Sequence, residues 1–445
     1  MTMIATNTKQ RYKHILLLAG PLIAAMVSQN LLNLVDSYMI AKIGTAALAA
    51  VAAGGMITWL ASSINMSLST AVQQLTARRF GENQHTILAY SLNSGLLVTV
   101  ILGIPIGLVC SHYSTEIISL ITSDQEVIEL GTEYLRITFL AAPFYGFNNC
   151  FRGYWSAINK QKIYMLTLIV MHVINVLLNY CLIFGKWGLP ELGVSGAALA
   201  TMTSTLVGSI IYFSMAFLNL RQHGFAQIFP RSVLTSLIKL SIPNALQTFL
   251  YALSYCALYK IIALIGTAEL AVSGLIINFA LICYLPGEAL GLVATSLVGQ
   301  SLGKNDPQDA DLWARQTAKL SVLILGALST PFIFFPDHLL SAFIMERETV
   351  EVGITALSIL GLSMSIEGVA LVMQNALLGA GDSHRVMYIS IGTHWLFYLP
   401  ASWLMGIYFQ WNLNGIWLAN IFTQILLAAV FSKLWFAGNW KKIKI

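Results

Sequence analysis

The chain has 445 residues, of which 57% are hydrophobic and only 10% are charged, and its mean hydropathy is +0.73. An ordinary soluble domain carries about 25% charged residues, so this composition excludes a soluble globular protein and indicates one that crosses the bilayer many times. The formal net charge of +5 is explained by basic loops beside anionic lipid, and it requires no nucleic-acid partner.

Apolar runs long enough to cross a bilayer recur along the whole chain, since a spanning helix needs roughly 20 mostly apolar residues. The predicted spans are 14–40, 46–77, 87–111, 128–156, 161–184, 194–219, 236–264, 268–300, 312–335, 350–378, 386–408 and 413–436. The span 128–156 is the least clear, because Glu129, Glu133 and Arg136 crowd its start. The pattern predicts an all-α polytopic membrane protein with twelve transmembrane helices.

Basic residues favour one side of these spans. Most of the 24 Lys and Arg residues fall in the loops on the side of the N-terminus, and basic loops stay in the cytoplasm. We therefore expect a multi-pass protein of the inner cell membrane with both termini cytoplasmic.

The second half of the chain resembles the first. A shift of 222 residues places Pro21 on Pro243 and the GTA sequence at 44–46 on the GTA sequence at 266–268, and further on 151–160 faces 377–386. Because six is an even number, two six-helix copies enter the membrane in parallel, as in some transporters. We expect an N-lobe (1–218), a cytoplasmic linker (219–239) and a C-lobe (240–445) around a central cavity, in an alternating-access transporter.

Of the 19 acidic residues, all but three lie near the ends of predicted spans or in loops; the three that remain inside are Asp36, Glu288 and Glu367. A carboxylate at membrane depth is costly unless it faces a polar interior, so each is a functional candidate. Asp36 follows Gln29 and Asn33 on one stripe of its helix, Asn175 and Asn179 form a second stripe, and Thr201 comes in the next span. Oxygen ligands of this kind suit a proton relay or an alkali-cation site, although the asparagines could equally serve as hydrogen bonds between helices.

These residues resemble those of the multidrug and toxic compound extrusion (MATE) family, especially its bacterial NorM branch. VSQNLLNLVDS (27–37) is similar to the family's first helix, residues 178–201 to its fifth and sixth helices, and FRGYWSAINK (151–160) to its cytoplasmic RG turn. The resemblance implies a two-lobed exporter of small organic cations driven by inward flow of H+ or Na+, with no other cofactor. It also implies a membrane-embedded monomer that is a transporter and no enzyme.

The resemblance assigns roles residue by residue. The family's N-lobe acid falls on Asp36, its asparagines on Asn175 and Asn179, and its threonine on Thr201; Asp36, Asn179 and Thr201 would hold Na+ if sodium is the coupling ion. The C-lobe acid falls on Glu367. A glutamate that the family often has on helix seven is Tyr251 here, and Glu288 on the adjacent helix either replaces it or is satisfied by backbone freed around Pro286.

Polar and aromatic residues are candidates for the wall of a substrate cavity, because aromatic faces bind organic cations. The candidates are Gln29, Asn33, Tyr38, Tyr251, Tyr255, Trp395 and Tyr398. His394 could titrate near neutral pH, although a packed neutral histidine is the stronger interpretation.

Two other functions fit parts of the sequence. GAGD (379–382) contains the GxGD pattern of intramembrane aspartyl proteases, but no second aspartate at that depth is available to share a proton. A lipid-linked sugar flippase has a related two-lobed architecture, but its pyrophosphate cargo calls for arginines in the cavity, whereas the acids here favour cationic cargo.

Overall fold

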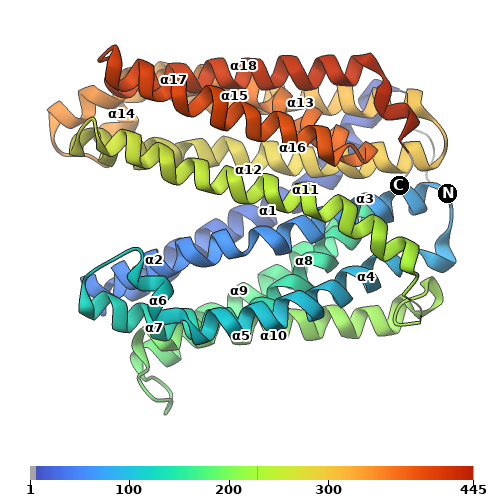
Figure 1. The fold of residues 1–445 in the computed structure, drawn as a ribbon, viewed down its shortest axis with the longest axis horizontal. Helices are drawn as coiled ribbons and strands as arrows, with labels where there is room; N and C mark the ends of the chain where they lie inside the picture. The colour runs from blue at the N-terminus through green and yellow to red at the C-terminus, as the bar shows by residue number, and fades with distance from the viewer. Residues whose placement is uncertain (1–6, 228, 444–445) are drawn as a thin grey trace. The chain divides into compact units, whose positions relative to one another are not determined.

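The computed structural model of the protein describes residues 7–227 and 229–443, the side chain of residue 64 excepted, and this part of the chain is almost wholly helical (Figure 1). The helices of the first half are α1 (Thr8–Ala41), α2 (Thr45–Ala61), α3 (Ser63–Gly81), α4 (Tyr90–Val98), α5 (Ile104–His112), α6 (Ser114–Ser119), α7 (Gln125–Leu140), α8 (Ala142–Ala157), α9 (Gln161–Phe184) and α10 (Gly193–Asn219). Those of the second half are α11 (Arg231–Ala263), α12 (Thr267–Gly303), α13 (Pro307–Phe334), α14 (Pro336–Ser341), α15 (Arg347–Ala380), α16 (Ser383–Gly392), α17 (Leu399–Trp403) and α18 (Asn412–Ala437).

Shorter segments connect or continue these helices. The 3₁₀ turns are η1 (His85–Ile87), η3 (Arg221–His223) and η6 (Asn439–Lys442), and the π-helical segments are η2 (Thr99–Gly103), η4 (Thr393–Tyr398) and η5 (Leu404–Tyr408). The π segments continue their helices without a break, so they adjust the helical register inside two of the predicted spans, 87–111 and 386–408.

The predicted spans coincide with the helices. Within the described residues, ten helices are long and apolar enough to cross a membrane. The remaining two predicted spans are each built from consecutive segments: α7 and α8 meet at Ala141, and α16 continues through η4 and α17 to η5. The predicted all-α polytopic class is therefore confirmed.

Contacts divide the chain into two compact units. One, the N-unit, comprises residues 21–245, and the other, the C-unit, comprises the residues up to 20 together with those from 246 onward. Two long helices, α1 and α11, thus change unit near their prolines, Pro21 and Pro243. The predicted linker 219–239 contains the end of α10, η3 and the first turns of α11, and the predicted lobe boundaries stay a prediction.

Within the N-unit, a small apolar core fixes the helices that carry Asp36 and its neighbours. Ile40 of α1 packs with Ala47 of α2, Ile183 of α9 and Val194 and Ala197 of α10. Ile40 lies one helical turn beyond Asp36, so burial of this cluster holds the carboxyl group against α9 and α10.

One very close helix crossing of the N-unit has a counterpart in the C-unit. A Cβ atom added to Gly153 of α8 would collide with the backbone carbonyl oxygen of Ser69 in α3, and one added to Gly379 of α15 would collide with that of Thr295 in α12. Gly379 lies 226 positions after Gly153, and Thr295 lies 226 positions after Ser69, so the two halves repeat the same crossing. This is the structural counterpart of the repeat seen in the sequence.

Candidate ion and substrate site

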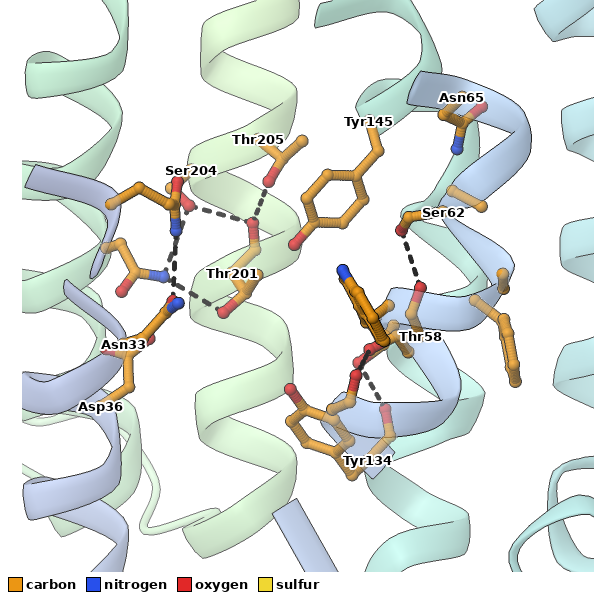
Figure 2. A pocket seen from close by; sticks show the side chains of 18 of the residues that line it. Asn33, Asp36, Thr58, Ser62, Asn65, Tyr134, Tyr145, Thr201, Ser204 and Thr205 are labelled. Carbon is orange, nitrogen blue, oxygen red and sulfur yellow. Dashed lines mark hydrogen bonds between the residues drawn. The ribbon is translucent and has the colours of Figure 1, made fainter. Parts of the chain in front are cut away.

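The structure brings Asp36, Asn175, Asn179 and Thr201 into one hydrogen-bonded network across α1, α9 and α10. Asn179 Nδ2 donates to Asp36 Oδ1 at 2.6 Å and to Asn175 Oδ1 at 3.0 Å. Asn175 Nδ2 in turn donates to Thr201 Oγ1 at 3.2 Å. Asn175 and Asn179 are almost completely buried, so their amides must find partners inside the unit. The network lies on one side of the cavity drawn in Figure 2.

The amide of Asn175 has two orientations with different consequences for Asp36. In one, its oxygen faces Asp36 Oδ1, and two oxygens in contact require a proton between them. In the other, its nitrogen donates to Asp36 Oδ1 at 3.2 Å and its oxygen accepts a hydrogen bond from Thr201 Oγ1 at 3.2 Å, but that nitrogen then lies 3.0 Å from Asn179 Nδ2, so the hydrogen bond from Asn179 is lost. The first arrangement suits a protonated carboxyl group and the second suits an ionised one.

A second polar contact joins α1 and α9 two turns away. His172 Nε2 lies 3.1 Å from Gln29 Oε1, and Gln29 Nε2 donates to Asn33 Oδ1 at 3.2 Å. Gln29 and His172 precede Asp36 and Asn179 by seven residues each, so both bonds lie along the same seam between the helices. The predicted stripe of Gln29, Asn33 and Asp36 therefore faces α9.

The seam opens into a cavity of about 580 Å³ inside the N-unit. The titratable side chains that line it are Asp36, Tyr134, Tyr145 and His172. Among the cavity-lining residues of the described chain there is no lysine or arginine, and Asp36 is the sole carboxyl group. Figure 2 shows Thr58, Ser62 and Asn65 on the side opposite Asp36, with the tyrosine rings between the two sides.

The opposite side of the cavity was not predicted as part of the site. It arises where the second predicted span breaks at Ser62 into α2 and α3, and the hydroxyl of Ser62 donates to the backbone oxygen of Thr58 at 2.7 Å. Serine hydroxyls that bond back along a helix often bend it. The polar run SSIN at 62–65, inside an otherwise apolar span, is the signal that could have indicated this break.

In the C-unit, Glu367 of α15 lies among tyrosines. Tyr251, Tyr255, Tyr284 and Tyr398 all lie within electrostatic range of its carboxyl group. The hydroxyls of Tyr251 and Tyr255 are 3.3 Å apart, and the ring of His394 packs edge-on against Tyr251 at 4.7 Å between centroids. Three of the predicted cavity aromatics therefore surround the predicted C-lobe acid.

The remaining predicted residues lie in different surroundings. Glu288, on α12, is half-buried, and Tyr284 lies within electrostatic range of both Glu288 and Glu367. The Trp395 ring nitrogen donates to the backbone oxygen of Leu250 at 3.1 Å. Tyr38 is 65% exposed, lies outside the lining of the N-unit cavity, and packs its ring against the ammonium group of Lys42.

Asp382, the acid of the GAGD sequence, lies in the turn between α15 and α16. Its carboxyl group is paired with Arg385 at 3.4 Å and is 7% exposed. Burial raises the pKa of Asp382, and the charge of Arg385 opposes that shift. Pairing with Arg385 in a turn explains why Asp382 is present at this position. The position therefore gives no support to a protease.

The long apolar helices, with a cavity among them that carries a carboxyl group, indicate a multi-pass membrane protein. The family model MatE matches this chain twice, over residues 21–181 and 243–404. The chain therefore belongs to the MatE family, whose members are transporters, and the resemblance to the NorM branch is confirmed. The two matches begin 222 residues apart, which is the shift found in the sequence.

Relatives match over nearly the whole chain. "Probable multidrug resistance protein YoeA" of Bacillus subtilis is 26% identical over 408 residues, covering 89% of this chain and 87% of that protein. "Probable multidrug resistance protein NorM" of Thermotoga maritima is 24% identical over 438 residues, covering 97% and 93%. The crystal structure of a mutant of the Vibrio cholerae MATE transporter VcmN has a TM-score of 0.88 at 22% identity and covers 98% and 99%, which supports the same fold.

Proposed function

We propose that this protein is a cation-coupled antiporter that exports small organic cations by alternating access, with Asp36 as the residue at which coupling ion and cargo compete. The observation that carries the proposal is the N-unit cavity: its sole carboxyl group is Asp36, and no lysine or arginine lines it in the described chain. Such a cavity attracts cations when Asp36 is ionised and loses that attraction when Asp36 is neutralised. The names of its relatives as multidrug resistance proteins agree with export of such compounds.

The hydrogen bonding favours H+ over Na+ as the coupling ion. A sodium site would need oxygen atoms of Asp36, Asn179 and Thr201 to face one point. Asn179 instead presents its nitrogen to Asp36 at 2.6 Å, whereas its own buried Oδ1 has no hydrogen-bond partner in the described part of the chain. Binding Na+ would require that amide to turn, whereas a proton can bind Asp36 while Asn175 Oδ1 faces the carboxyl group and still accepts the hydrogen bond from Asn179.

Coupling then follows from competition. Ionised Asp36 holds the organic cation, and a proton arriving from outside neutralises the carboxyl group, so the cation leaves. Proton release on the cytoplasmic side restores the charged site for the next cation. Because both ligands bind the same carboxyl group, each lowers the affinity for the other.

We infer the same membrane arrangement as the sequence predicts. The protein would lie in the inner membrane as a monomer, with both termini in the cytoplasm and lipid around its apolar helices. Single cysteines can be placed at residues 8 and 439. A membrane-impermeant thiol reagent should label neither of them in intact cells and both after the cells are opened. Labelling of either position in intact cells would contradict this orientation.

Transport by purified protein in liposomes tests the function. Ethidium efflux should follow an imposed pH gradient, fail to follow a sodium gradient, and be lost in Asp36→Asn. Glu133→Gln is the matched control, because Glu133 is an exposed carboxyl group that accepts a hydrogen bond from Ser195 and does not line the cavity. Efflux driven by a sodium gradient alone would show that the coupling ion is Na+ and not H+. Efflux under neither gradient would contradict the proposal and favour the lipid-linked sugar flippase.

A further inference from the structure

We propose that His172 is a second proton-binding residue of the N-unit cavity, so that two protons enter for each organic cation exported. This inference rests on the proposed antiport and adds to it the number of protons exchanged. Asp36 is the first proton-binding residue, and His172 lines the same cavity from α9. Imidazole is the side chain whose unperturbed titration lies nearest neutral pH.

The hydrogen bonds around His172 fix which ring nitrogen carries the proton. Gln29 donates from Nε2 to Asn33, so its Oε1 is the atom that faces His172. An acceptor in this position requires a proton on His172 Nε2. Nδ1 is then the basic nitrogen, and it has no hydrogen-bond partner among the described residues. A second proton can therefore bind at Nδ1 without breaking the bond to Gln29.

The surroundings of His172 leave its charge uncompensated at close range. The titratable groups that face the cavity from the neighbouring helices are Asp36 of α1, Tyr134 of α7 and Tyr145 of α8, whereas α10 contributes the hydroxyls of Thr201, Ser204 and Thr205. Asp36 is bonded to Asn179, seven residues beyond His172 on α9, which corresponds to about 10 Å along the helix. The two groups are thus separate sites that share one cavity.

Both protonation events oppose the binding of a cation. A proton on Asp36 removes the attractive charge, and a proton on His172 adds a repulsive one, so the cavity changes from a net charge of −1 to +1. The cargo-bound state holds no extra proton on either group, and the empty state returned to the cytoplasm holds one on each. Exchange of two protons for one monovalent cation moves one net positive charge inward per cycle.

The number of charges moved gives a direct test. In liposomes with an imposed pH gradient, an added membrane potential of about 59 mV, negative on the side to which protons move, should raise the equilibrium ethidium gradient of the wild-type protein about tenfold. His172→Gln should exchange one proton for one ethidium, so its gradient should not respond to the potential. Glutamine is the matched replacement, because its amide can still donate a hydrogen bond to Gln29 but cannot take up a proton.

A second measurement uses binding instead of transport. In detergent, below the titration ranges of both groups, the ethidium Kd of the wild-type protein should change about 100-fold per pH unit, and that of His172→Gln about tenfold. A merely structural role for His172 would change the Kd itself and leave this slope unaltered. His172→Asn serves the same purpose if the glutamine variant cannot be purified.

Failure of this inference differs from failure of the proposed function. A wild-type protein that follows the pH gradient but ignores the potential, or a His172→Gln variant that still responds to it, would overturn the role of His172 alone. Loss of all response to the pH gradient in the wild-type protein would overturn the antiport itself.

Discussion

Asn179 illustrates how a single residue can set the working range of the site. It donates a short hydrogen bond to Asp36, and such a bond to a charged group contributes roughly 1.5–3 kcal/mol. Asn179→Ala removes stabilisation of the ionised carboxylate, so Asp36 should hold its proton up to a higher pH. The midpoint of ethidium binding as a function of pH should move upward by about one to two pH units. An unchanged or lowered midpoint in a pH titration would contradict this assignment.

The residues of the site differ in how far the sequence predicts them. Gln29, Asn33 and Asp36 share a helix face because of their spacing, so their common orientation follows from helical periodicity. His172 shares a face of α9 with Asn175 and Asn179, but its contact with Gln29, 143 positions away, follows from no spacing. The same holds for Asn65, whose position depends on the break between α2 and α3 and not on any spacing.

At the level of whole helices, the close crossing of α3 and α8 makes Gly153 indispensable. Gly153→Ala should force the two backbones apart and destabilise the protein by about 1–3 kcal/mol, as other overpacked interiors do. Gly392→Ala at the end of α16 is the control, because a Cβ there meets no atom within 4 Å. The Tm of each variant is measured by thermal unfolding in detergent, with intrinsic fluorescence as the signal. Equal Tm values for the two variants would show that the crossing can relax.

The beginning of α1 is held by a largely buried ion pair of the C-unit. Arg11 is 6% exposed, lies 2.6 Å from Asp309, and stacks its guanidinium group on Trp313 of α13 at 4.4 Å. Asp309 also accepts hydrogen bonds from Ser301 and from the ring nitrogen of Trp313, at 2.6 and 2.9 Å. The carboxyl group of Asp309 is thus the point at which α1, α12 and α13 meet.

Breaking this pair should be costly. Arg11→Ala leaves Asp309, whose side chain is only 14% exposed, without its counter-charge, and the loss of one partner costs about 3–5 kcal/mol where a pair is fully buried, which is the upper limit here. Arg347→Ala is the control: the Arg347–Asp337 pair has the same 2.6 Å length but both side chains are exposed, so its loss should leave the Tm almost unchanged. A double variant Arg11→Ala with Asp309→Asn that is no less stable than either single variant would confirm that the two act as a pair.

Helix boundaries were more predictable than helix shape. All twelve predicted spans coincide with helices to within a few residues, because the length of apolar runs is set by the membrane. The break at Ala141 and the π-helical segments of the span 386–408 had no counterpart in the sequence analysis. Such distortions depend on neighbouring helices that supply alternative hydrogen bonds, which a single stretch of sequence does not reveal.

At the scale of the whole molecule, the repeat was the most informative property of the sequence. It predicted two halves with one architecture, and the matched crossings at Gly153 and Gly379 bear this out. The halves have diverged in their chemistry: Asp36 corresponds to Leu258 at the shift of 222 residues, and the C-unit carries Glu367 among tyrosines instead. Shared architecture could therefore be predicted from similarity between the halves, but the chemistry of each site had to be derived from its own residues.

The division of α1 and α11 between the units has a consequence for how the gene can be cut. A break in the loop before Arg231 separates the two halves of the sequence, but it leaves residues 8–20 on the first fragment and residues 231–245 on the second. Each fragment then lacks the segment that completes its own unit and carries the segment that completes the other. We expect either fragment expressed alone to be degraded, and both expressed together to restore ethidium resistance, as in reciprocal genetic complementation.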